Sequence, residues 1–179
     1  MNKTILSLLV TLLAAHSALA TAAQYCDPSF PQTSPTTRWV LKADGTALDK
    51  RTGLIWKRCA EGQTWNGTSC QGVFPFMTWQ NALKLADSAV FAGKSDWRLP
   101  DPKEMTSIFE YACVSPALSP TVFPNLATTN GSAELWTSTS MAHPNEFWGK
   151  SGYLYFGTIE QEDKTSPDWA GALLVRSAP

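Results

Sequence analysis

Few residues of this sequence are suited to catalysis. His143 is the one histidine after residue 20, and a Ser-His-Asp mechanism would need it, but it precedes a proline in a predicted loop and no nucleophile-elbow motif occurs. Glu160, Glu162 and Asp163 offer paired carboxylates for acid–base chemistry. A charge cluster after a strand is, however, typical of a solvated turn. We therefore expect no catalytic residue and no enzymatic activity.

Four cysteines, at positions 26, 59, 70 and 113, are able to bind a metal or form disulfides. None of their spacings is the two-residue interval of a zinc ligand pair, so we expect no metal and no cofactor. The loop from Cys59 to Cys70 is rich in turn residues and favours a local disulfide, which leaves Cys26 to pair with Cys113. Disulfides are typical of exported proteins.

Aromatic side chains form the first candidate binding surface. The sequence has eight tryptophans, more than a small core needs, and exposed indole rings stack on sugars or fill a partner's pocket. The proline-punctuated segment 114–130 is predicted to be a long loop, and such loops often carry binding residues. We expect the ligand to contact this loop and four aromatic residues of the late strands, Trp136, Trp148, Tyr153 and Tyr155. The alternative is that these rings belong to the core.

Basic residues between positions 42 and 58 form the second candidate surface. Together they would attract sulfated or uronic-acid glycans, or an acidic protein surface. The residues are Lys50, Arg51, Lys57 and Arg58, with Lys42 nearby. A solvated face is the alternative. After residue 20, 13 basic residues stand against 15 acidic ones, so the net charge is near −2 and we expect no nucleic-acid partner.

The N-terminal residues have the pattern of a signal peptide. Lys3 precedes an apolar run over 5–15 that is too short to span a bilayer, and Ala18-Leu19-Ala20 forms a small-residue cleavage site. We expect a signal peptide over 1–20, an extended arm over 21–37 and one domain over 38–179. The mature protein is then expected to be periplasmic, secreted or at the bacterial cell surface, without membrane insertion.

Two groups of predicted strands flank the middle of the chain. Turn residues such as Asp44-Gly45 separate short apolar runs and predict a meander. The expected strands cover 38–42, 46–48, 54–59, 135–139, 153–159 and 169–175. Because strands, helices and strands follow in that order, the sequence predicts an α+β domain with antiparallel strands, two helices and long loops. The N- and C-terminal strands are expected to share a sheet.

Both predicted helices have capping residues. Thr78 caps the first, which we expect to end at Gly93, and Asp101 with Glu104 forms a capping box for the second, which we expect to end at Cys113.

Between the two helices, a short strand is predicted to bury Trp97 and Leu99 on one face. Arg98 then points the other way and pairs with Glu104 or Asp96.

Several ordered segments resemble the Lcl C-terminal domain family, named for the C-terminal domain of a bacterial collagen-like adhesin. The most specific is Asp96-Trp97-Arg98-Leu99-Pro100, followed by Lys103-Glu104-Met105. The resemblance also includes 49–56, 78–82, 120–124 and 135–139, and it spans residues 39–176. It implies a C-type-lectin-like fold, related to that of formylglycine-generating enzymes. Those enzymes use a late cysteine pair, and no cysteine follows Cys113 here.

The resemblance implies three functions of different classes, between which fold alone does not choose. The first is a non-enzymatic module for adhesion or glycan binding at the bacterial envelope, since family members occur in adhesins, including glycosaminoglycan binders. The second is a structural or assembly factor that binds an envelope protein of a surface appendage such as a type IV pilus. The third is a degenerate relative of the formylglycine-type oxidases.

Overall fold

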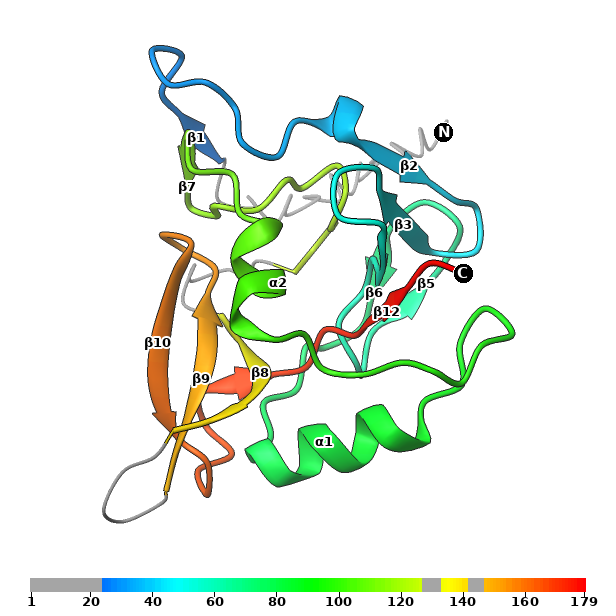
Figure 1. Cartoon of the computed structure of the whole chain (residues 1–179), viewed down its shortest axis with the longest axis vertical. Helices are drawn as coiled ribbons and strands as arrows, with labels where there is room; N and C mark the ends of the chain where they lie inside the picture. Colours follow the sequence, from blue (N-terminus) through cyan, green and yellow to red (C-terminus); the bar gives the residue numbers. More distant parts are fainter. Residues whose placement is uncertain (1–23, 127–132, 142–146) are drawn as a thin grey trace, which may run out of the picture.

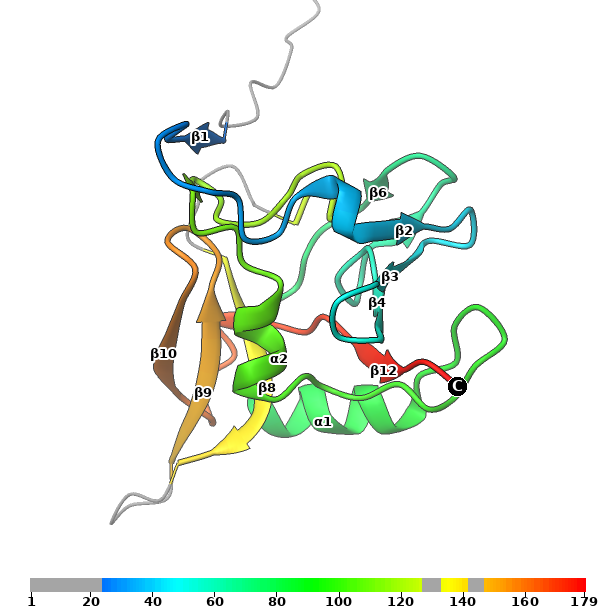
Figure 2. The same ribbon diagram turned by 45° about the horizontal axis from the view of Figure 1, so that its top comes forward.

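The computed structural model describes residues 24–126, 133–141 and 147–179. The predicted signal peptide and His143 lie outside the described residues. One four-stranded sheet has the order β12-β4-β3-β2, and a second has the order β10-β9-β8-β11. Helix α2 lies between the two sheets (Figure 1), and the view in Figure 2 shows the same arrangement. The strands are mostly antiparallel, so the predicted α+β class is confirmed.

The first sheet contains the predicted meander of β2 (Trp39–Leu41), β3 (Thr46–Asp49) and β4 (Leu54–Lys57). Strand β12 (Val175–Ser177) adds to it antiparallel to β4. The prediction that N- and C-terminal strands share a sheet is therefore confirmed.

A buried carboxylate, that of Asp49, closes the meander. It accepts hydrogen bonds from Arg38 Nε at 2.6 Å, from the Arg51 backbone N–H at 2.9 Å and from Thr52 Oγ1 at 2.6 Å, and it also pairs with Arg38 Nη2. Burial by itself would raise the pKa of Asp49, but these hydrogen bonds outweigh it and hold the pKa below its usual value. The turn between β3 and β4 is thus built around a charged, fully satisfied side chain.

The second sheet differs from its prediction. It consists of β8 (Glu134–Ser140), β9 (Trp148–Tyr153), β10 (Thr158–Asp163) and β11 (Ala170–Gly171), which is parallel to β8. The single strand expected over 153–159 is wrong, because residues 154–157 form the turn between β9 and β10 and Gly157 has a φ of +72°. The aromatic run favoured a strand by propensity, whereas the strands that pair on either side of it are polar.

Both helices begin where predicted and end earlier. Helix α1 (Trp79–Ser88) is capped by Thr78, and α2 (Pro102–Ser107) has the expected capping box. After α1 the chain makes a tight turn over 91–94, and after α2 it must become extended so that β7 (Cys113–Val114) can pair with β1 (Tyr25–Cys26). Neither described helix is long and apolar enough to cross a membrane.

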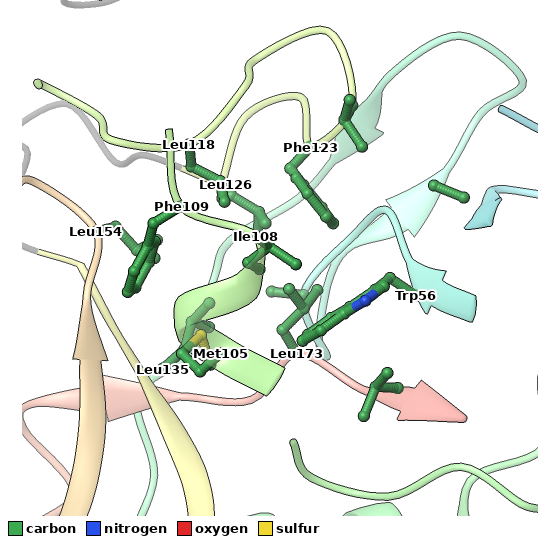
Figure 3. Close-up of a cluster of buried hydrophobic side chains, with 14 of the residues drawn as sticks. Trp56, Met105, Ile108, Phe109, Leu118, Phe123, Leu126, Leu135, Leu154 and Leu173 are labelled. Atoms are coloured by element: carbon green, nitrogen blue, oxygen red, sulfur yellow. The ribbon is translucent and has the colours of Figure 1, made fainter. Parts of the chain in front are cut away.

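Helix α2 supplies the centre of the core (Figure 3). Met105 and Ile108 are fully buried in one cluster with Trp56 of β4 and Leu135 of β8. A Cβ on Gly152 of β9 would lie 2.6 Å from Met105 Cγ, so the close contact of helix and strand requires glycine there.

The segment after β7 was expected to form part of the ligand surface and instead packs into the core. Within its described part, the apolar side chains of Leu118, Val122, Phe123 and Leu126 are buried. Residues 115–126 contain no helix or strand, as the predicted loop requires, but their apolar side chains face the core; residues 127–130 lie outside the described part. The apolar residues between its prolines provide the physical reason.

The two disulfides have the predicted pairing, Cys26–Cys113 and Cys59–Cys70. The first holds the N-terminal segment, which buried Glu110 also anchors by accepting hydrogen bonds from the backbone N–H groups of Thr33 and Ser34, each at 2.9 Å. The second closes the hairpin of β5 (Thr64–Trp65) and β6 (Cys70–Gln71).

The long disulfide is expected to contribute more stability than the short one. The pairs are separated by 87 and 11 residues, and loop-closure entropy gives about 4.5 kcal/mol for the first and about 3 kcal/mol for the second. Replacing Cys26 and Cys113 together by Ser should lower the free energy of unfolding in urea more than replacing Cys59 and Cys70 together. The reverse order would show that the short bridge carries native-state contacts that the entropy argument omits.

Candidate functional site

A groove with aromatic and basic walls lies on one side of the molecule. The turn between β2 and β3, the β5–β6 hairpin and the turn after α1 all lie on this side in Figures 1 and 2. They enclose a cleft of about 290 Å³, whose lining includes Asp44, Lys57, Trp65 and Phe91. A depression of about 70 Å³ adjoins it, shares Asp44, and is lined by Lys42, Ala92, Lys94 and Arg176 among others. We call the two together the Trp65–Phe91 groove.

Trp65 is fixed by its neighbours before any ligand arrives. Its indole N–H donates to the Ala43 carbonyl at 2.9 Å, and the guanidinium carbon of Arg58 lies 4.2 Å from its ring centroid. Gly45 has a φ of +83°, and a Cβ there would lie 2.7 Å from Trp65 Cγ. The ring is half-buried, and the groove is lined by the part that remains exposed.

Phe91 stands at the opposite wall, at the start of the tight turn 91–94. Its backbone N–H and carbonyl both pair with Lys94, and its ring packs edge-on against Trp97 at 5.9 Å. The central residues, Ala92 and Gly93, have φ values of 50° and 69°, as a two-residue hairpin turn requires. For alanine this left-handed conformation costs about 1 kcal/mol, and such strain is concentrated at functional sites.

The charges of the groove leave two lysines free. Lys57 pairs with Glu61 and lies 4.5 Å from the Phe91 ring centroid, while Arg176 Nε donates to Asp96 at 2.7 Å. That hydrogen bond from Arg176 is the main reason why the pKa of Asp96 lies below its usual value. Among the described residues, Lys42 and Lys94 form no ion pair. The groove therefore offers two lysines outside any direct ion pair, beside two aromatic rings and the carboxylate of Asp44.

The predicted basic patch does not form as one exposed surface. Thr46 pairs with Lys57, so Lys57 lies at the open end of the β3–β4 hairpin, whereas Lys50 and Arg51 are exposed in the turn at its other end. Arg58 is buried and donates to the carbonyls of Val122 and Thr121 at 2.9 and 2.8 Å. Strand register thus separates residues that are neighbours in sequence.

The predicted aromatic surface is also divided. Trp136 is fully buried, and its indole N–H donates to the Met77 carbonyl at 2.7 Å, so the expectation that its ring is available to a ligand was wrong. Trp148 is exposed, and Tyr153 and Tyr155 are half-buried on the β9–β10 hairpin, on the far side of α2 from the groove.

The segment before α2 has the predicted geometry. Trp97 and Leu99 are buried, and Arg98 pairs with Glu104 while Asp96 pairs with Arg176. A further cleft of about 260 Å³ lies between this segment and α1, but the one base in its lining, Arg98, is already paired.

Sequence reasoning missed the pairing of Trp65 with Phe91. The two residues are 26 positions apart, in a disulfide loop and in a turn after a helix, and no periodic pattern connects them. The one local indication was the Ala92-Gly93 pair, which favours a tight turn.

Comparison with known proteins gave one informative result. The family model described as the Lcl C-terminal domain matches residues 45–175, a range that includes Lys57, Trp65, Phe91 and Lys94. A search of curated proteins found no match, and neither did a search of solved structures.

The carboxylates considered for acid–base chemistry lie on the second sheet. By register, Glu160 and Glu162 of β10 share a face with Glu134 of β8, whose carboxylate accepts a hydrogen bond from Ser151 Oγ at 2.5 Å. Burial raises the pKa of Glu134 to about 7, the Ser151 hydrogen bond opposes this, and the charges of Glu162 and Glu160 add to it. Within the described part of the chain, no group of three or more His, Cys, Asp or Glu is arranged to hold a metal ion.

Glu134 should make the folded protein less stable as the pH rises. A carboxyl whose pKa is higher in the folded state contributes its stability in full below about pH 4.5 and loses it as the pH rises to about 7. Glu134→Gln should therefore match the wild type at pH 5 and exceed its free energy of unfolding at pH 8, by about 2 kcal/mol after allowance for screening.

Urea unfolding across this pH range gives the comparison, with Asp87→Asn, at an exposed carboxylate on α1 outside the second sheet, as the control. Parallel pH profiles for Glu134→Gln and the wild type would show that Glu134 is ionised throughout.

Proposed function

Because the chain belongs to the Lcl C-terminal domain family, we propose that it is a non-enzymatic binding module that holds an acidic carbohydrate in the Trp65–Phe91 groove. The observation that carries this proposal is the placement of two aromatic side chains in the cleft and of two lysines, outside any ion pair among the described residues, in the depression beside it. Adhesion or glycan binding at the bacterial envelope is the corresponding biological role.

The groove has the chemistry that sugar recognition needs. The carbon–hydrogen face of a sugar ring packs on exposed aromatic surface, here that of Trp65 and Phe91. Hydroxyl groups require donors and acceptors, which the Thr64 hydroxyl and the second carboxylate oxygen of Asp44 provide, while the Gln63 amide is already hydrogen-bonded to Ala60 and Asn125. The cleft volume of about 290 Å³ is near the lower end for small-molecule sites and suits one sugar ring, with the rest of the chain outside.

The positive charges favour an acidic sugar over a neutral one. Lys42 and Lys94 lie in the depression beside the cleft, where a carboxylate or sulfate of the adjoining sugar would reach them. Because these lysines are exposed, their contribution depends on ionic strength.

The compartment and the fold relationship belong to the same proposal. Two disulfides are typical of proteins that work outside the cytoplasm, which supports the expected export. Helix α2 between two mostly antiparallel sheets (Figure 1), with the last strand paired to an N-terminal one, supports the C-type-lectin-like relationship.

Removing the Phe91 ring should weaken binding of a uronic-acid-containing, sulfated hexasaccharide about tenfold, since truncating a binding aromatic costs about 1.4 kcal/mol or more. Isothermal titration calorimetry of Phe91→Ala measures this. The matched control is Phe30→Ala, since Phe30 is 61% exposed and does not line the groove.

The double variant Lys42→Gln/Lys94→Gln should bind more weakly and lose most of the salt dependence of binding. A neutral hexasaccharide should bind worse than the acidic one in the wild type and equally in this double variant. Equal binding of all proteins to the acidic sugar would place any carbohydrate site outside the groove.

A further inference from the structure

The outer strand of the second sheet has an edge that no described residue covers. Strand β10 pairs with β9 on one side and with no described strand on the other, and it is the outermost strand of the sheet in Figures 1 and 2. Its backbone groups on that side are therefore free to pair with another chain.

The side chains along β10 are acidic and uncompensated. Glu160 and Glu162 alternate with other residues on one face, and no Lys or Arg of the described residues pairs with either of them. Burial, and after it the charge of Glu160, raise the pKa of Glu162, and the charges of both residues add to the raised pKa of Glu134. Neutralising this charge would be favourable for any cationic partner.

Aromatic rings lie at both ends of this strand. At the turn, the rings of Tyr153, Tyr155 and Phe156 form a cluster, with Tyr155 and Phe156 4.6 Å apart and Phe156 54% exposed. At the opposite end, Trp148 pairs in register with Asp163 and is 38% exposed. An extended segment along β10 would thus meet the two glutamates on one face and the ring cluster at the turn, while Trp148 of β9 lies on the other face of the sheet.

We infer that β10 is a docking edge for a basic, extended segment of a partner protein, which adds to the sheet as a fifth strand. Backbone hydrogen bonds hold such a segment, and its alternate side chains give specificity. Lysine or arginine at alternate positions would face Glu160 and Glu162, and an apolar residue would reach the ring cluster. This surface is independent of the groove and lies on the other side of α2.

A second copy of this chain is a poor occupant of the same edge. Two β10 strands paired antiparallel around Gln161 would place Glu160 of one copy opposite Glu162 of the other. Like charges directly opposite one another destabilise strand pairing, so the edge disfavours self-association.

The test uses ten-residue peptides in which lysine alternates with threonine or valine, and a matched set with glutamate in place of lysine. The full mature protein should bind the lysine peptide, more weakly at about 300 mM than at about 50 mM salt, and should not bind the glutamate peptide. The double variant Glu160→Lys/Glu162→Lys should bind the lysine peptide more than tenfold more weakly than the wild type does. It should also bind the glutamate peptide, which the wild type does not. Asp87→Lys/Asp168→Lys, the same charge change at exposed residues outside β10, should behave like the wild type.

A third peptide separates strand addition from simple charge attraction. It has the lysine sequence with alternate backbone nitrogens methylated, which keeps the charge and removes half of the donors. Methylating alternate nitrogens gives two such peptides, one for each set of alternate positions. At least one of them should no longer bind, since one set of N–H groups must face β10. Unchanged affinity of both methylated peptides, failure of the charge swap, or dimerisation through β10 in sedimentation experiments would overturn the inference.

Discussion

The buried ion pair of Asp49 and Arg38 holds the part of the molecule on which the groove is built. Asp49 accepts hydrogen bonds from Arg38, from the Arg51 backbone and from Thr52, so it fixes the end of β3 and the turn into β4 together. The same two strands carry Gly45 and Lys57 at their other end, where the groove opens. Removing either member of this buried pair would leave the other charge without a partner and would lower the free energy of unfolding by about 3 to 5 kcal/mol.

Helix α2 connects the first sheet, which this ion pair fixes, to the second sheet. Met105 of α2 and Ile108 at its C-terminal end are in one cluster with Trp56 of the first sheet and Leu135 of the second, and Gly152 permits the close contact with β9. The two sheets therefore cannot move apart without opening the core, which is packed at the density of a solid. The groove and the β10 edge are consequently held on opposite sides of a rigid centre.

The sequence correctly predicted the features that depend on interactions between residues close in the chain. The Thr78 cap, the Asp101–Glu104 capping box, the meander turn at Asp44-Gly45 and the Cys59–Cys70 loop each depend on residues close in sequence, and each was confirmed. One error came from long-range competition. The second helix was expected to continue to Cys113, but that residue is needed in an extended strand beside Cys26, and this pairing cannot be inferred from helix periodicity.

The binding surfaces were harder to predict than the fold for the same reason. Lys57 and Lys50 are close in sequence, yet register sends them to opposite ends of a hairpin, while Trp65 and Phe91 are far apart and meet across a cleft. A binding surface is made of elements that lie next to one another in space. Which elements are neighbours is determined by the packing of the core. Since the basic groove and the acidic edge face opposite directions, occupation of one leaves the other accessible. If both proposals hold, the module would bind an anionic glycan and a cationic protein segment at once, which is the arrangement that attachment of one to the other requires.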